Sequence, residues 1–142
     1  SVHNAVAGLY SIFVNNKQPM TAISAGEDSL LMALVDAYAK LESQDLDKIL
    51  VVYTDEVVPD KYKAYVPVTE KSIAIALILE KHSSNNSSNN SSNKSIEMNF
   101  TTQKEAEFET DPQPLAFLSY LYGDKNEAKI NSKRYQWHLS KS

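Results

Sequence analysis

The chain has 142 residues, of which 42% are apolar, and a net charge of -4 from 14 basic and 18 acidic residues. This length and apolar content suffice for one core and hardly for two, so we expect one domain or a part of one. The acidic balance argues against a nucleic-acid partner, and no apolar run approaches the roughly 20 residues that span a bilayer. The chain has no cysteine, which excludes disulfides, thiolate metal sites and a cysteine nucleophile and suits a cytoplasmic protein.

The first third of the chain predicts two helices on either side of a turn. Residues 3–14 place apolar side chains at helical spacing and predict a short, buried helix. The apolar stretch 20–23 has the length of a strand and leads directly into the Ser-Ala-Gly turn at 24–26. Residues 27–41 are the strongest helix candidate, with two acidic residues in the first turn, where the helix dipole favours them. Their apolar stripe consists of Leu30, Leu31, Leu34, Val35, Tyr38 and Leu41.

The remainder predicts strands and one more helix. The β-branched run 49–53 predicts a strand buried on both faces, and residues 72–79 predict another core strand. The Ser/Asn tract 83–94 is of low complexity and is expected to form a solvated connection. Residues 96–102 alternate between apolar and polar and are expected to pair antiparallel with the preceding strand, and the last two elements are a helix at 112–122, closed by Gly123, and a final strand at 134–139.

Four sequence blocks resemble the beta-ketoacyl synthase-like family of truncated ketosynthase N-terminal domains. They are residues 1–42, KILVVYTDEVVP at 48–59, PLAFLSYLYG at 114–123 and RYQWHL at 134–139. Within the first block, SVHNAVAG at 1–8 and SAGED at 24–28 lie at the spacing that the family shows. The resemblance implies an α/β, thiolase-like fold with a mixed sheet and a buried central helix. Because the family is longer at its N-terminus, it also implies that residues 1–142 form the C-terminal part of a single ketosynthase-like domain, incomplete without a preceding segment.

The resemblance directs attention to the turn before the central helix. In a ketosynthase of this fold, that turn presents a cysteine at the N-terminus of a buried helix, whose dipole lowers the thiol pKa. The match places Ser24 at the cysteine position, with Ala25 as the alternative. A serine hydroxyl is a poorer nucleophile and needs an adjacent base, but none of His3, His82 and His138 lies in a motif that matches the catalytic histidines. Ser24 also has a purely structural interpretation, as the first residue of an S-x-x-E capping box with Glu27.

We therefore expect a non-catalytic protein, similar to a chain length factor, without a metal or cofactor. The resemblance implies a cytoplasmic partner of an active ketosynthase in aryl polyene biosynthesis, a pathway of polyketide or fatty-acid type. The chain would also contact its own preceding segment and, through the complex, an acyl carrier protein. The residues expected at the acyl tunnel or the subunit interface are Leu9, Phe13, Met20, Thr21, Ala22, Ile23, Glu27, Leu30, Leu31 and Leu34.

Two other functions are compatible with the sequence. One is a standalone serine-dependent acyl hydrolase or transferase that uses Ser24 or, at the start of the chain, Ser1. The other is a structural dimerisation module without an acyl tunnel. The remaining polar candidates have structural interpretations: His3 and Asn4 as a buried hydrogen-bonded pair, Asp55 and Glu56 as a strand end, and Tyr135 and Trp137 as the cover of a sheet edge.

Overall fold

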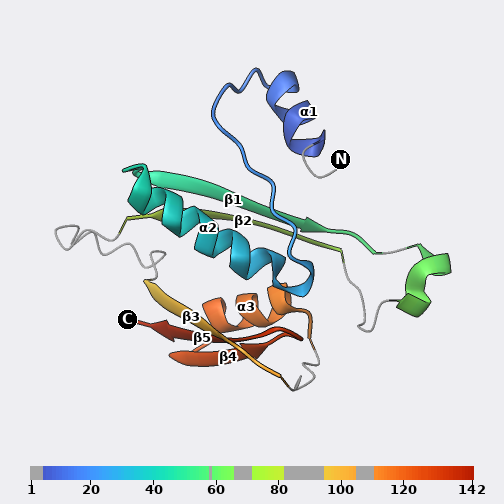
Figure 1. The fold of residues 1–142 in the computed structure, drawn as a ribbon, viewed down its shortest axis with the longest axis vertical. Helices are drawn as coiled ribbons and strands as arrows, with labels where there is room; N and C mark the ends of the chain where they lie inside the picture. Colours follow the sequence, from blue (N-terminus) through green and yellow to red (C-terminus); the bar gives the residue numbers. More distant parts are fainter. Residues whose placement is uncertain (1–4, 58, 66–71, 82–94, 105–110) are drawn as a thin grey trace.

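The computed structural model describes residues 5–57, 59–65, 72–81, 95–104 and 111–142 (Figure 1). Helix α1 (Ala5–Phe13) is followed by a long irregular link to the one-turn 3-10 helix η2 (Gly26–Asp28) and the central helix α2 (Ser29–Ser43). Strand β1 (Lys48–Asp55), the 3-10 helix η3 (Asp60–Tyr65) and strand β2 (Ile73–Glu80) come next. The last third of the chain holds β3 (Ile96–Thr102), α3 (Gln113–Tyr122), β4 (Glu127–Asn131) and β5 (Tyr135–Lys141).

The central helix is formed by the apolar stripe that the sequence predicts. Leu30, Leu31, Leu34 and Leu41 are buried, and Ala37 completes the same face. Tyr38, counted with the stripe from its spacing, is instead exposed. The helix ends where Asp45 adopts a positive φ of 49°, a conformation that Asp tolerates better than most residues. The buried central helix is thus confirmed.

Strands β1 and β2 form an antiparallel two-stranded sheet that covers one side of α2. The inward side chains include Val51 and Ile75, both buried in the core. The outward side chains Leu50, Val52 and Ile78 are more than 60% exposed, although all are apolar. The prediction that the first of these strands is buried on both faces is therefore wrong for the described chain, because nothing in it covers the outer face.

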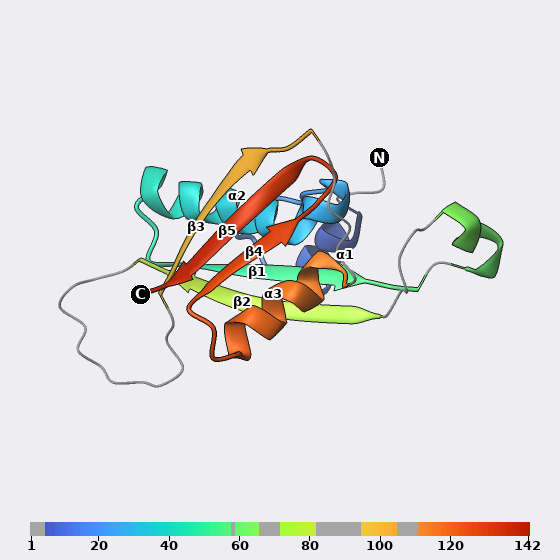
Figure 2. The ribbon, with the colours of Figure 1, turned by 90° about the horizontal axis from the view of Figure 1, so that it is seen from below.

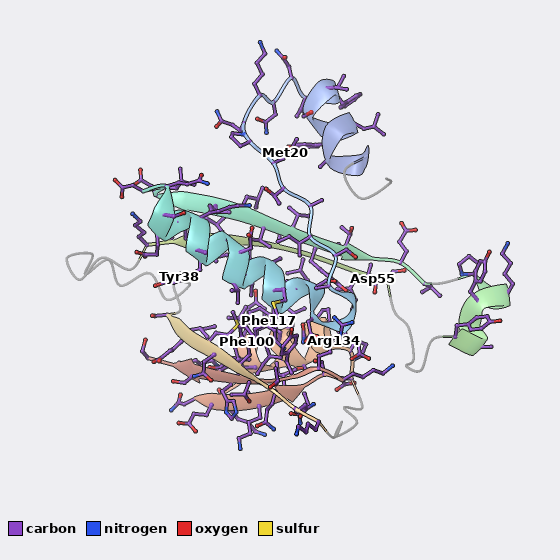
Figure 3. The ribbon with its side chains drawn as sticks, viewed as in Figure 1. Met20, Tyr38, Asp55, Phe100, Phe117 and Arg134 are labelled. Atoms are coloured by element: carbon purple, nitrogen blue, oxygen red, sulfur yellow. The ribbon has the colours of Figure 1, made fainter. Side chains whose placement is uncertain are left out.

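The second sheet is three-stranded and antiparallel, in the order β3-β5-β4. Its inner face carries Met98, Trp137 and Ile130, which join α2 and Phe117 of α3 in one core (Figures 1 and 3). The register confirms strands at both predicted positions but pairs β3 with β5, so that Phe100 lies opposite Trp137. The expectation that residues 96–102 pair with the preceding strand is wrong. Short β4 was not predicted at all.

The layers stack in a simple order. Figure 1 shows β1 and β2 above α2, with α3 and the β3-β5-β4 sheet below it, and Figure 2 shows the strands of the two sheets crossing at an angle. The α/β class is confirmed. All strand pairs among the described residues are antiparallel, so the parallel pairing that a mixed sheet requires is not found in this part of the chain.

Two N-terminal predictions are corrected by the structure. The predicted first helix forms, but it stands apart from the core (Figure 1), and Leu9, Ile12 and Phe13 are 68%, 79% and 91% exposed rather than buried. Residues 20–23 are not a strand, because no strand among the described residues supplies hydrogen bonds to their backbone. Ser1, His3, Asn4, His82 and the 83–94 tract lie outside the described residues.

Candidate functional site: the turn before the central helix

The segment that enters the turn is extended and solvent-exposed. Met20, Thr21, Ala22, Ile23 and Ser24 are all exposed and have no regular secondary structure. One side-chain bond ties this segment to the body of the protein: the Lys40 ammonium, from the last turns of α2, donates to the Thr21 hydroxyl at 2.8 Å. Met20 lies on the part of the link that rises toward α1 (Figure 3). The backbone of this segment is thus accessible to a partner strand.

The turn itself is closed by glycine and serine. Gly26 has a φ of +58°, a left-handed conformation that a residue with a side chain adopts only with strain. The Ser29 hydroxyl then bridges the turn, accepting a hydrogen bond from the Ala25 backbone N–H at 2.9 Å and donating to the Gly26 carbonyl at 2.7 Å. The N–H of Asp28 also donates to the Ala25 carbonyl. Ala25 is therefore held at both of its backbone polar groups.

A buried carboxylate lies directly behind the turn. Asp28 is only 3% exposed, at the N-cap position of α2. Its Oδ1 accepts two hydrogen bonds, from the indole Nε1 of Trp137 at 2.8 Å and from Nε2 of Gln113 at 3.0 Å. Trp137 is fully buried and Gln113 nearly so. One atom of Asp28 thus joins the start of α2 to β5 and to the start of α3.

Glu27 makes a second connection to the C-terminal sheet. Its Oε2 accepts a hydrogen bond at 3.1 Å from the backbone N–H of Lys133, in the turn between β4 and β5. No side-chain cap is found at η2 or at α2. The capping box predicted for Ser24 and Glu27 is therefore wrong: Ser29 closes the turn, and Glu27 bonds a distant loop.

The residues predicted at the tunnel or interface fall into two groups. Leu9, Phe13 and the 20–23 segment are exposed, as is Glu27, whereas Leu30, Leu31 and Leu34 are buried in the chain's own core. Ser24 lies in the exposed turn, and Ala25 is half-buried. Of the histidines, only His138 belongs to the described residues, and its Nε2 is 3.1 Å from Oε1 of Gln136 on the same strand.

Sequence reasoning missed Asp28, Gln113 and Trp137 as a unit. Trp137 was expected to cover a sheet edge, but it lies in the central strand of its sheet and is fully buried. A buried indole needs an acceptor for its N–H, and Asp28 supplies it from a position 109 residues earlier in the chain. Only the acidic residues of the first turn could have suggested this acceptor.

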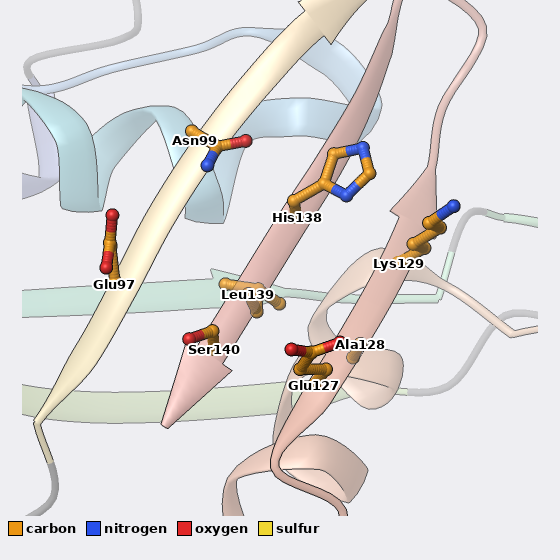
Figure 4. Close-up of a pocket in the computed structure, with 8 residues that line it drawn as sticks. All are labelled: Glu97, Asn99, Glu127, Ala128, Lys129, His138, Leu139 and Ser140. Atoms are coloured by element: carbon orange, nitrogen blue, oxygen red, sulfur yellow. The ribbon is translucent and has the colours of Figure 1, made fainter. Parts of the chain in front are cut away.

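A polar hollow of about 450 Å³ lies on the outer face of the β3-β5-β4 sheet (Figure 4). The strand register aligns Glu97, Ser140 and Glu127 in one row and Asn99, His138 and Lys129 in the next. Among the described residues, no three His, Asp or Glu side chains gather so as to hold a metal ion, here or elsewhere. We interpret this surface as the solvated face of a half-buried sheet. The described residues contain no helix that is long and apolar enough to cross a membrane.

Comparison with known proteins identifies the fold. Residues 1–140 match the family model described as the beta-ketoacyl synthase, N-terminal domain. A solved structure from Xenorhabdus doucetiae, a ketosynthase (ApeO) in complex with its chain length factor (ApeC), contains a chain that is 25% identical, with a TM-score of 0.76. That match covers 99% of the present chain and 54% of the other, so this chain spans about half its length. No curated protein matches. The chain belongs to the family of beta-ketoacyl synthase N-terminal domains and has its α/β, thiolase-like fold.

Proposed function

We propose that this chain is a non-catalytic partner of an active ketosynthase, acting as a chain length factor in aryl polyene biosynthesis. The observation that carries the proposal is the combination of a turn without a cysteine and an exposed apolar surface on the segments that precede it. Ser24 occupies the predicted nucleophile position. Exposed apolar residues precede it along the chain and form what we call the N-terminal apolar surface: Leu9, Tyr10, Ile12, Phe13, Met20 and Ile23.

The N-terminal apolar surface suits contact with another protein. Leu9, Tyr10, Ile12 and Phe13 line an apolar hollow on α1. Monomeric soluble proteins rarely expose contiguous apolar patches larger than a few hundred Å². Residues 20–23 have no strand partner within the described part of the chain, so their backbone could form a ladder with the same segment of a related subunit, in a two-fold arrangement. The outer face of the β1-β2 sheet adds Leu50, Val52 and Ile78, which further supports a chain that works in an assembly.

In this role the chain would limit the length of the growing acyl chain sterically. The exposed residues of the N-terminal apolar surface can reach a tunnel at the interface directly. Leu30, Leu31 and Leu34 are packed in the core, so they could affect the tunnel only by supporting the residues that line it. The acyl carrier protein would meet the complex and not this chain alone. The chemistry would reside in the ketosynthase, so this chain would need no cofactor. We place the complex in the cytoplasm as part of the same proposal.

Native mass spectrometry of the chain co-expressed with the ketosynthase of its own cluster tests the proposal. We expect a one-to-one complex. Phe13→Asp should abolish it, because burying a Phe contributes about 1.5–3 kcal/mol and the carboxylate would also lose its hydration. Since about 1.4 kcal/mol is tenfold in Kd, the loss should exceed tenfold. Tyr65→Asp is the matched control: Tyr65 is 83% exposed on η3, away from this surface, and its replacement should leave the complex intact.

Product analysis tests the tunnel separately. Ile23→Phe or Leu9→Trp enlarges an exposed residue without disturbing the core, so either should shorten the polyene made by the reconstituted system. A lone monomer or homodimer in the mass spectrum would contradict the partner role. An intact complex whose products keep their length in every variant would leave the pairing but exclude control of length.

A further inference from the structure

The first observation concerns the charge at the end of α2. A helix N-terminus carries a partial positive charge, which favours an anion placed there. In a nucleophile-bearing turn that anion would be a thiolate or the oxyanion formed by attack. Here the N-cap position is taken by the carboxylate of Asp28, which is buried and held by Trp137 and Gln113. No ion pair to Asp28 is formed by the described residues.

The second observation concerns the hydrogen-bond donors of the turn. Acyl transfer needs backbone N–H groups that point at the developing oxyanion. The N–H of Ala25, at the alternative nucleophile position, already donates to the Ser29 hydroxyl at 2.9 Å. The N–H of Asp28 donates to the Ala25 carbonyl. The backbone N–H groups of Ala25 and Asp28 are thus engaged within the turn.

From these observations we propose that Asp28, assisted by Glu27, acts as a built-in anion that closes the turn to nucleophilic chemistry. This inference rests on the proposed non-catalytic function and extends it: inactivity is a property of the whole Ser24 to Ser29 turn and not only of the missing thiol. Restoring a cysteine would therefore not restore a reactive nucleophile. A carboxylate close to a thiol raises the thiol pKa, because two like charges repel each other, so Asp28 disfavours a thiolate in this turn.

Other charged groups near the turn do not offset Asp28 and Glu27. The ammonium of Lys40 is paired with Asp36 at 2.7 Å and bonds Thr21. Lys133 meets Glu27 through its backbone N–H, and its side chain and that of the next residue, Arg134, are on an exposed turn, where solvent screens them.

The test introduces a thiol and measures its ionisation. Ser24→Cys and Ala25→Cys are made with and without Asp28→Asn, and the rate of alkylation by iodoacetamide is followed from pH 5 to 10. With Asp28 present, the midpoint should lie at or above that of an ordinary cysteine, about 8.5. Asp28→Asn should raise the rate at pH 7 on the order of tenfold, because it removes the charge and keeps an acceptor oxygen.

Two further variants complete the design. Ser43→Cys, at the other end of α2, is the control whose rate Asp28→Asn should leave unchanged. Glu27→Gln keeps an acceptor for the Lys133 N–H. It should raise the alkylation rate of a cysteine at residue 24 less than Asp28→Asn does. If Asp28→Asn fails to fold, Glu27→Gln still tests whether a carboxylate near the turn suppresses the thiolate. A cysteine at 24 with a midpoint well below 8 beside Asp28, or a rate indifferent to both charge removals, would overturn the inference. The alkylation assay needs no ketosynthase, so its result does not depend on whether the chain forms a complex.

Discussion

Replacing Asp28 by alanine should be among the most destabilising single changes in this chain. The substitution leaves two buried donors, the Trp137 indole N–H and the Gln113 amide, without their common acceptor. A buried donor that loses its partner costs about 1–3 kcal/mol. The two together should lower the free energy of unfolding by about 2–6 kcal/mol, a large part of the 5–15 kcal/mol typical of a domain.

Trp137 provides the assay, because it is the chain's single tryptophan and is fully buried beside Asp28. Urea unfolding of the dilute chain, followed by tryptophan fluorescence, should show a lower midpoint with an unchanged slope. Asp28→Asn keeps one acceptor oxygen and should cost markedly less than alanine. Asp36→Ala removes a half-exposed carboxylate on the same helix, which is paired with Lys40, and should change the free energy by less than about 1 kcal/mol. If Asp28→Ala costs no more than Asp36→Ala, the hydrogen-bond network does not hold the layers together.

Three smaller predictions follow from single contacts. Burial, and to a smaller extent the charge of Glu127, raise the pKa of Tyr120. Above pH 10 the phenol therefore ionises in the unfolded chain while it is still neutral in the folded chain, and the free energy of unfolding should fall. Urea unfolding between pH 9 and 11 should show this fall, and a less steep one in Tyr120→Phe. Gly123→Ala would place a methyl group 2.6 Å from the Ser119 carbonyl oxygen and should lower the melting temperature by several degrees, at a cost of about 1–3 kcal/mol; an unchanged melting temperature would show that the helix end yields freely. Ser29→Ala removes both side-chain bonds of the turn and should cost about 1–2 kcal/mol in the same thermal scan, with Ser29→Thr retaining part of it.

The elements that sequence predicted well are those in which a local period decides the structure. The leucine stripe predicts α2, and the alternation of 96–102 predicts β3 to the residue. Strand β4 has only five residues, with Glu and Lys among them, and becomes a strand only because β5 lies beside it. The pairing of β3 was also mispredicted. The strand nearest in sequence was expected as its partner, but β3 pairs with β5, whose Trp137 and Leu139 are buried in the core.

The sequence predicted the turn before the central helix but not the hydrogen bonds that surround it. The resemblance located the turn at Ser24, and the helix that follows begins within a few residues of the expected start. The bonds that join the turn to α3 and β5 connect residues 85 and 109 positions apart, and no local pattern shows which carboxylate is buried. The exposure of α1 and of the β1-β2 outer face was likewise unpredictable, because apolar runs indicate burial without showing which surface provides it.

The strand order β3-β5-β4 also affects how the molecule is made. The middle strand, β5, is synthesised after both of its neighbours. On the ribosome, β3 and β4 therefore emerge before the strand that pairs with them and have unpaired edges until it arrives. Asp28 is synthesised 109 residues before Trp137, so its hydrogen bond with the indole can form only after β5 has emerged. Contacts so distant in sequence slow the search for the native state, and during that time the exposed edges and the apolar face of α2 are available to chaperones or to aggregation. Any change that delays the arrival of β5 should therefore reduce the yield of folded protein before it reduces the stability of what has folded.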